Sequence, residues 1–326
     1  MLVRKFILLL LLITTNALAN VIPRYNTQNY DYTIKQIYKT LPANYNIKGK
    51  VKFISGYFLG KPYLLGALGE GPVAIFDKSP LYRTDAFDCL TYVATVLALA
   101  ESNNLAEFQK NIKRINYSQG QVKFLYRNHF TSTDWNPQNQ ANGYLRDITK
   151  KITDRNHHSI VKIARAYINK PNWFRNLPVS CIKQFVPLSA IKMQQLLFQL
   201  HSLGGLTKLV KSEIYYLPLN KLFNSQNKAN MYLFNQIPSG SIIEIIRPNW
   251  NLRGKIGTNL QVSHLGFAVR TKQGLMFREA SSLENKVIDI SLIDYLKDYL
   301  KSSTVKGINV QQILFPDTKF RKNATQ

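Results

Sequence analysis

The hydrophobic period changes in the last third of the chain, and this change constrains the fold more than any other feature. After Pro238, short segments alternate apolar and polar residues: "SGSIIEIIRP", "QVSHLGFAVR", "GLMFREAS", "KVIDIS" and "INVQQILFP". A period of two is typical of strands that bury one face, and short turns between them favour antiparallel pairing. The sequence therefore predicts a mostly antiparallel sheet here.

Helical patterns come before this sheet. Apolar spacing and capping residues predict helices near residues 29–40 and 47–58, within "NGYLRDITKKI" (142–152), and over "PLSAIKMQQLLFQLHSL" (187–203). The Asn-, Lys- and Tyr-rich stretch from about 103 to 235 is predicted to be a helical insertion. The fold class is thus α+β.

Cys89, one of two cysteines, lies where a helical pattern begins in "DAFDCLTYVATVLALA". Asp88 is a good cap residue, and Leu90, Val93 and Leu97 share one face of the helix that follows. Unpaired N–H groups in a first turn favour a thiolate, so Cys89 is a candidate nucleophile. Two alternatives are a small buried hydrophobe and, in an oxidising compartment, a disulfide with Cys181.

Of the five histidines, His264 in "QVSHLGFAV" is the candidate base. Strand alternation puts Val262, His264, Gly266 and Ala268 on one face, and the small residues leave room for a helix start to approach. The alternative is a core histidine satisfied by a neighbour.

Glu279 lies on the next predicted strand, after a turn centred near Lys272 and Gln273. If that turn has an even number of residues, Glu279 shares the face of His264, one diagonal step away, and can accept its second N–H. An odd turn would point Glu279 away, and a surface salt bridge to Arg270 or Arg278 is the alternative.

Metal chemistry is not expected. His157, His158 and Asp154 are too close together in one polar segment to define a tetrahedral site, and the chain has no HExxH motif or paired CxxC. We predict neither a metal nor an organic cofactor.

These residues resemble a family, the NlpC-type papain-like cysteine peptidases and amidases of bacterial cell walls. The resemblance covers about residues 50–315 and lies in "DCLTYV", "VSHLGFAV" and "FREASS". It implies a papain-like core in which Cys89, His264 and Glu279 are catalytic, although His, Asn or Gln is usual at the position of Glu279. "LGKPYLLG" resembles a Gly-x-Pro-Tyr-x-x-Gly segment and implies that Tyr63 lies near the site. Tyr63 is therefore predicted to bind substrate, and it is a candidate for the second oxyanion donor.

A further segment, "YRNHFTSTDW", resembles one found in the N-acetylmuramoyl-L-alanine amidase branch, where the insertion builds the substrate cleft. The resemblance implies substrate binding by Arg127, His129, Asp134 and Trp135. A guanidinium suits carboxylates, and an indole suits a sugar face. The alternative is a packed aromatic beside an Arg–Asp salt bridge.

The chain start, "MLVRKFILLLLLITTNALAN", reads as a signal peptide over residues 1–19. Its apolar run is short of the roughly 20 residues that span a bilayer, so we predict no stable membrane insertion after cleavage. We expect a helical segment at 20–49, a catalytic domain at 50–315 with the insertion at about 103–235, and a tail at 316–326. The protein is then exported, to the periplasm or beyond.

The net charge of the chain indicates which classes of partner it can attract. Net charge is +25, or +23 without Arg4 and Lys5, and it is spread along the chain. Such a surface attracts polyanions, and acidic cell-wall polymers are available to an exported protein, whereas no nucleic-acid recognition motif is present. The oligomeric state is not predicted.

The sequence thus predicts a cysteine amidase that cleaves the N-acetylmuramoyl-L-alanine bond of peptidoglycan or its turnover fragments. The alternatives are a D-glutamyl-diamino acid endopeptidase of the same fold and a non-catalytic, basic cell-wall binding protein.

Overall fold

The alternating segments after Pro238 form the predicted antiparallel strands. The computed structural model describes residues 21–314, so the predicted signal peptide (1–19) and tail (316–326) lie outside the described residues. The strands are β4 (Ile242–Asn251), β5 (Asn259–Thr271), β6 (Gly274–Ser281), β7 (Lys286–Ser291) and β8 (Gly307–Ile313).

Three more strands join them in one eight-stranded sheet with the order β2-β3-β8-β4-β5-β6-β7, and β1 also pairs with β8. All pairs are antiparallel. The added strands are β1 (Leu145–Asp147), β2 (Lys162–Asn169) and β3 (Leu209–Pro218). Because all three lie between residues 103 and 235, the prediction of a purely helical insertion was wrong.

The helix predicted over 142–152 was also wrong. Its residues form β1 and a 3-10 turn at Thr149–Lys151, because pairing with the edge of β8 overrides the local helical spacing. In β2 the buried positions are Ala164, Ala166 and Ile168. Two alanines give the alternation too little contrast to be seen in the sequence.

The predicted helices near 29–40, 47–58 and 187–203 are confirmed as α1 (Thr27–Thr40), α2 (Ile47–Tyr57) and α7 (Ala190–Gly205). The remaining α-helices are α3 (Cys89–Ala100), α4 (Leu105–Asn116), α5 (Asn136–Ala141), α6 (Lys170–Arg175), α8 (Leu219–Leu222), α9 (Met231–Asn235), α10 (Arg253–Ile256) and α11 (Leu292–Lys297). Short helical turns lie at Ser118–Gly120, Phe124–Tyr126, Thr131–Trp135 and Val179–Cys181.

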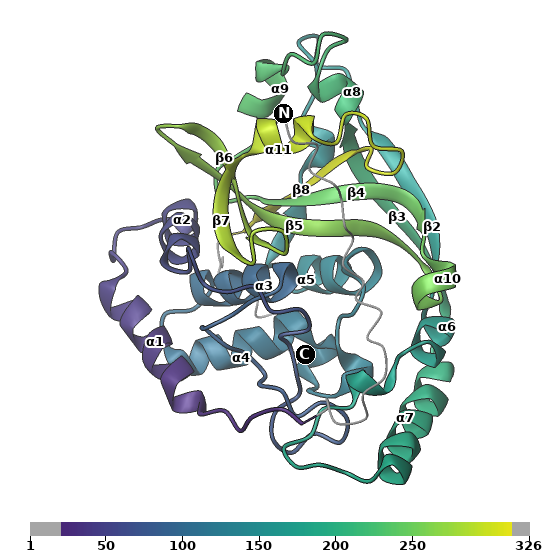
Figure 1. Cartoon of the computed structure of the whole chain (residues 1–326). Helices are drawn as coiled ribbons and strands as arrows, with labels where there is room; N and C mark the ends of the chain where they lie inside the picture. Colours follow the sequence, from purple (N-terminus) through teal and green to yellow (C-terminus); the bar gives the residue numbers. More distant parts are fainter. Residues whose placement is uncertain (1–20, 315–326) are drawn as a thin grey trace.

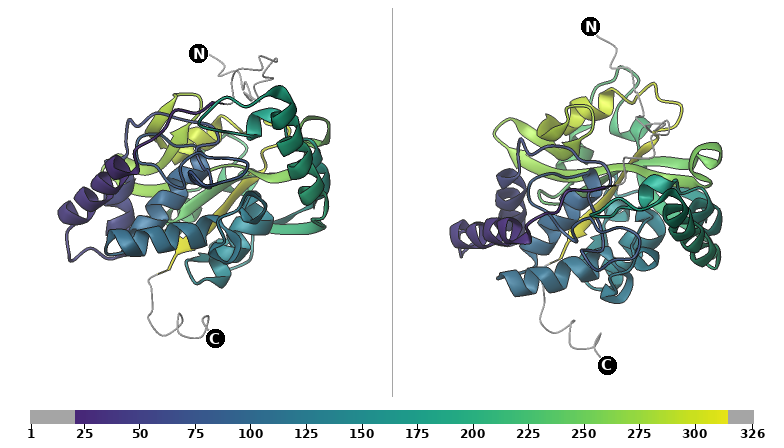
Figure 2. Two further views of the ribbon diagram at one scale, coloured as in Figure 1. Left: turned by 90° about the horizontal axis from the view of Figure 1, so that it is seen from below. Right: turned by 60° about the horizontal axis from the view of Figure 1, so that its bottom comes forward.

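Helices cover both faces of the sheet. Figure 1 shows α3, α4 and α5 on one side and α8, α9 and α11 on the other. Figure 2, seen from below, shows the blue helices of the first side in front of the green and yellow strands. Each side has its own core, with Phe267 among the residues on the α3 side and Phe277 among those on the α11 side.

α3 is the centre of the first core. Every residue from Thr91 to Ala100 is buried, and the helix packs against β5 and β6. A helix that is apolar on all sides belongs in an interior, so only the first turn of α3 is left to face an opening. Cys89 lies in that turn and is partly exposed.

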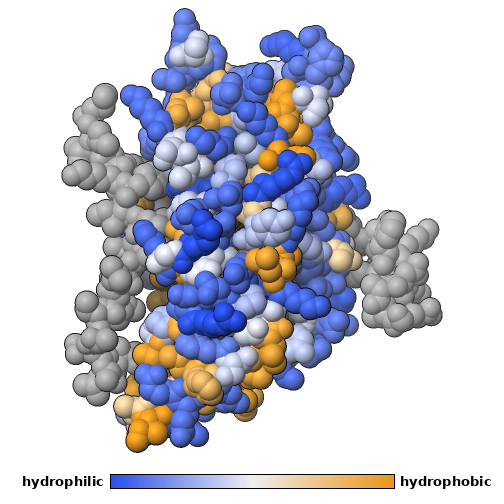
Figure 3. All heavy atoms as spheres, turned by 90° about the vertical axis from the view of Figure 1, so that its right-hand side faces the viewer, coloured by the Kyte–Doolittle hydropathy of each residue, from blue (hydrophilic) through white to orange (hydrophobic). Residues whose placement is uncertain are grey.

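α7 lies at the rim and exposes an apolar strip, which Figure 3 shows as orange side chains at the foot of the molecule. Ile191, Phe198 and Leu206 are 73%, 74% and 81% exposed. The opposite side of α7 packs closely, because Gly204 lets the ring of Phe174 approach where a Cβ would lie 2.1 Å from its Cγ. Among residues 21–314, no helix combines the length and the apolar character that a membrane crossing requires.

Candidate active site

The first turn of α3 is fixed by a capping box. The backbone N–H of Thr91 donates to the Asp88 carboxylate at 2.8 Å, and the backbone N–H of Asp88 donates to the Thr91 hydroxyl at 2.9 Å. Asp88 is therefore the predicted N-cap, and Cys89 is the first residue of the helix. This position places the sulfur beside backbone N–H groups that have no partner within the helix.

Cys89 and His264 lie close enough together for the sulfur to raise the pKa of the imidazole. On its other side, Nε2 of His264 donates to the carboxylate of Glu279. The structure thus brings together the three residues that the sequence predicted as catalytic.

The turn between β5 and β6 decides where Glu279 points. Thr271 pairs with Gly274, so two residues, Lys272 and Gln273, lie between the paired positions. This even number puts Glu279 on the face of His264, as the sequence analysis required. The salt-bridge alternative does not describe it, because Arg278 pairs with Asp289 instead, at 2.7 Å.

A β-bulge corrects the predicted faces of β5. On β4, Ile245 pairs with His264 and the next residue, Ile246, pairs with Val262, so Ser263 is an extra residue. The bulge puts Val262 and His264 on opposite faces, because their partners are successive residues of β4. Simple alternation had put them on one face.

Gly266, the small residue near His264, does not have the role that the sequence predicted for it. Gly266 does not make room for a helix start, because the Phe277 ring occupies that space and a Cβ at Gly266 would lie 2.8 Å from it. Phe277 and Tyr295 form an aromatic wall around His264, with ring centroids 5.8 Å and 6.4 Å from the imidazole. Sequence reasoning missed Tyr295, which lies on the short helix α11.

The charge on His264 follows from these neighbours. Burial alone lowers the pKa of an imidazole, but the Glu279 carboxylate and the Cys89 sulfur outweigh it and hold the pKa of His264 well above its ordinary value. The site therefore favours the charged form of the imidazole.

Tyr63 lies beside Cys89, as the resemblance implied. It packs against the α3 core and forms a β-bridge with Phe87, two residues before the cysteine. Burial and the charge of Cys89 raise the pKa of Tyr63. The phenol thus keeps its proton and can donate a hydrogen bond.

Arg127, predicted to bind substrate, is engaged in an internal ion-pair network. Its guanidinium donates to Glu70 and, at 3.3 Å, to Asp77, and the side chains of the two acids are 3% and 2% exposed. This geometry corresponds to the structural alternative weighed for the sequence, with Glu70 and Asp77 as the acids in place of Asp134.

The other three residues predicted to bind substrate are also packed or paired. His129 contacts the carbonyl of Phe124 at 2.8 Å, and burial holds its pKa well below the ordinary value. Asp134 pairs with Lys170, and Trp135 is 0% exposed. The structure offers no indole face of Trp135 to a sugar, because the ring lies in the α3 core.

Both cysteines are free, so the disulfide alternative does not describe the structure. Cys181 lies in a separate cluster with Phe76 and Ile182, where burial raises its pKa to about 11. Within residues 21–314, no three His, Cys, Asp or Glu side chains are grouped so as to hold a metal ion.

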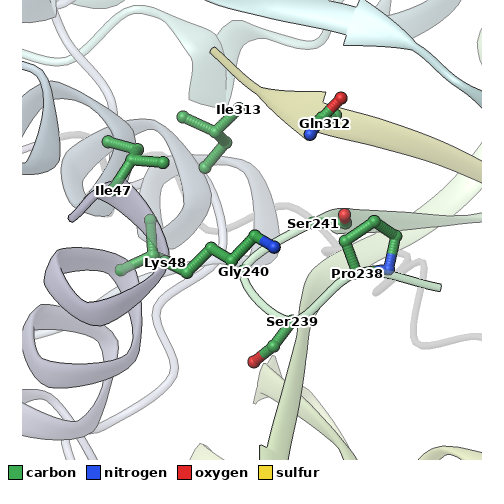
Figure 4. A pocket seen from close by; sticks show the side chains of 9 residues that line it. Ile47, Lys48, Pro238, Ser239, Gly240, Ser241, Gln312 and Ile313 are labelled. Carbon is green, nitrogen blue, oxygen red and sulfur yellow. The ribbon is translucent and has the colours of Figure 1, made fainter. Parts of the chain in front are cut away.

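A small pocket is separate from this site (Figure 4). It lies between α2, the segment that leads into β4 and the end of β8. Its volume is about 20 Å³, which is room for one water molecule. The residues that line it include Lys48, Ser241 and Gln312, and none of the predicted site residues is among them.

The model of a family described as AmiA-like, N-acetylmuramoyl-L-alanine amidase-like, matches residues 53–303. The chain belongs to this family. A comparison with curated proteins found no match.

Several solved structures resemble this chain in fold. A Legionella pneumophila protein of the DUF1460 family model is 44% identical, with 88% of this chain and 95% of that chain covered and a TM-score of 0.85. An N-acetylmuramoyl-L-alanine amidase from Bacteroides uniformis is 23% identical, with 82% and 98% covered and a TM-score of 0.55. A putative xylanase from Bacteroides fragilis is 24% identical, with 80% and 100% covered and a TM-score of 0.53. The last two are likenesses of fold, and their different names show that this fold alone does not determine an activity.

Proposed function

We propose that this amidase-like protein is a cysteine-dependent N-acetylmuramoyl-L-alanine amidase of NlpC-type, papain-like architecture. Its substrate is peptidoglycan or a soluble turnover fragment. The observation that carries the proposal is that Cys89, His264 and Glu279 lie together at the exposed end of a buried helix, with Nε2 of His264 donating to the Glu279 carboxylate. A nucleophile, a base and a group that orients the base are what acyl transfer requires.

In the proposed reaction, the Cys89 thiolate attacks the lactyl carbonyl carbon and forms a tetrahedral oxyanion. His264 then gives its proton to the nitrogen of L-alanine as the C–N bond breaks, which leaves a thioester. Water attacks the thioester and loses a proton to His264, and the C–S bond breaks to release the lactyl carboxylate. The enzyme ends with its thiolate and imidazolium restored.

The neighbouring residues have supporting roles in this proposal. Glu279 keeps the imidazole oriented and charged through its hydrogen bond to Nε2. The backbone N–H of Cys89 and the phenol of Tyr63 are the proposed oxyanion donors, because both lie at the start of α3 and both carry protons. Arg127, His129, Asp134 and Trp135 support the site through packing and ion pairs rather than through substrate contacts.

We also propose a domain assignment. Residues 50–315 form one catalytic domain with the insertion at 103–235, and β2 and β3 of this insertion extend the catalytic sheet. The N-terminal segment belongs to the same core, because Ile34 of α1 packs with the α3 residues and α2 already begins at Ile47. The signal peptide would export the protein, to the periplasm or beyond.

The test is digestion of a defined muropeptide by the wild type, by Cys89→Ala and by Cys181→Ala as the matched cysteine control. We expect a sugar-free peptide from the wild type and from Cys181→Ala, and no product from Cys89→Ala. Release of a disaccharide-dipeptide would instead identify the endopeptidase. Full activity of Cys89→Ala would overturn the cysteine mechanism.

A further inference from the structure

A cavity of about 680 Å³ opens beside the segment that leads into α3. Its walls come from the stretch before α1 and its first turns, from the loop around Leu64 to Ala67, and from the segment Ser79 to Asp85. This volume is within the range of sites that hold small molecules or short peptides. No residue of the proposed catalytic series lines it.

Residues that line the cavity lie near Cys89 in the sequence and are hydrogen-bonded to the two residues that precede it. The backbone N–H of Leu64 donates to the carbonyl of Phe87 at 2.9 Å, and that of Ala67 contacts the Asp88 carboxylate at 3.3 Å. Leu64 and Ala67 line the cavity, whereas Phe87 and Asp88 lead directly to the cysteine. Asp85, also in the wall, is four residues from Cys89, a separation that extended chain spans in at most about 14 Å.

The charge in the cavity is mainly positive. One acidic side chain lines it, Asp85. Four basic side chains line it: Arg24, Lys61, Arg83 and Lys183. Arg83 is neutralised by Asp85 through two hydrogen bonds of 2.7 and 2.8 Å. Lys183 donates to the carbonyl of Gly66 at 2.9 Å and pairs with Asp77 at 3.5 Å.

Arg24 and Lys61 are different. In the part of the chain that the structure describes, neither side chain has a carboxylate partner. Two unpaired cations in one concave site attract an anionic group more strongly than cations on a flat surface do. Exposed Leu64 and Leu65 add an apolar border, which suits the aliphatic parts of a peptide.

We propose that this cavity binds the acidic peptide part of the substrate and recognises its carboxylates through Arg24 and Lys61. The inference rests on the proposed function, which places the amide to be cleaved at Cys89. A stem peptide has its first free carboxylates on the second and third residues after that amide. Three extended residues reach about 10 Å, a length similar to the upper limit of about 14 Å that the chain sets between Cys89 and Asp85 in the cavity wall.

The recognition makes a chemical distinction. A stem peptide with free carboxylates forms charge-assisted hydrogen bonds with Arg24 and Lys61, whereas the same peptide with its carboxylates amidated does not. The protein is thus selective for the acidic form over the amidated form.

Binding can be measured without the reaction by using the full chain with Cys89→Ala. The probe is the tripeptide L-alanyl-γ-D-glutamyl-diamino acid, titrated by calorimetry beside its fully amidated form. We expect Lys61→Gln and Arg24→Gln, each added to Cys89→Ala, to weaken binding of the acidic tripeptide about tenfold, the size of one charge-assisted hydrogen bond. Binding of the amidated form should not change. Lys221→Gln on α8, on the other side of the sheet, is the matched charge control and should leave both affinities unchanged.

Equal affinities for the acidic tripeptide in the Lys61→Gln, Arg24→Gln and parent chains would overturn the inference. So would an equal loss for both peptides, because it would indicate a general disturbance of the cavity. The proposed function is tested separately with the wild-type cysteine. If the tripeptide binds as expected but the muropeptide amide stays intact, the cavity inference stands and the amidase proposal falls. If the wild type cleaves but neither cation affects its preference for the acidic peptide, the reverse holds.

Discussion

Replacing Glu279 with Gln tests the charge relationship at the centre of the site. The substitution keeps the shape of the side chain and a hydrogen-bond acceptor for His264, but it removes the negative charge. The side chains of His264 and Glu279 are 17% and 5% exposed, so water screens the pair only partly. At an effective dielectric constant of about 20 and a charge separation of about 4 Å, the attraction is about 4 kcal/mol. An attraction of this size holds the pKa of His264 above its ordinary value.

We therefore expect the pKa of His264 to fall in Glu279→Gln, with burial acting in the same direction once the carboxylate is gone. Because the imidazolium must protonate the leaving amine, the alkaline limb of kcat/KM against pH reports this pKa. The limb should move to lower pH by the same amount. Glu213→Gln, which changes an exposed carboxylate on β3, is the control and should leave the limb in place.

Stability gives a second measurement. A pKa that is raised in the folded protein contributes stability that is complete below the unfolded pKa of about 6.5 and is lost as pH rises through the folded pKa. Urea unfolding of the wild type should therefore show this alkaline loss, and Glu279→Gln should not. A uniform decrease in rate with both pH profiles unchanged would refute the reasoning, because it would mean that Glu279 orients His264 without setting its charge.

Three further substitutions test the surroundings of the site. Arg127→Ala leaves buried Glu70 without a cation and Asp77 with only the Lys183 ammonium at 3.5 Å, so the free energy of unfolding in urea should fall by about 3 to 5 kcal/mol while the KM of the folded enzyme stays the same; a raised KM with unchanged stability would restore Arg127 to substrate binding. Gly266→Ala would place a Cβ 2.6 Å from the Arg278 carbonyl oxygen, and we expect overpacking to cost about 1 to 3 kcal/mol, seen as a lower Tm; an unchanged Tm would contradict the described contact. Asp88→Ala removes the capping box, which should cost about 1 kcal/mol in thermal unfolding, and Asp88→Asn should recover most of it, whereas equal losses in both variants would count against capping.

The parts of the site that follow local rules could be predicted from the sequence. Asp88 and the apolar residues after it define the start of α3, and the start of a helix fixes where the Cys89 sulfur lies. The relation of Glu279 to His264 depends only on strand alternation and the length of one turn. Both are properties of adjacent residues, and patterns in sequence report such properties well.

The parts that depend on distant partners could not be predicted. Glu70 and Asp77 are more than 40 residues from Arg127, and nothing near Arg127 indicates that they are its partners. The residues next to Trp135 in the sequence do not indicate whether its side chain is buried or exposed, and only the fold shows that it is buried. The bulge at Ser263 could not be predicted from the sequence of β5 either. A residue is extra only in relation to its partner strand, which here is β4.

The place of β8 has a consequence for how the chain is made. This strand is the last one among residues 21–314, yet it lies between β3 and β4 and also pairs with β1. A nascent chain that lacks it holds two half-sheets with open edges, and such edges are the ones that pair with other chains. Synthesis must therefore pass Ile313 before the two halves can lock together, and a chain that stops before β8 would leave both halves with open edges.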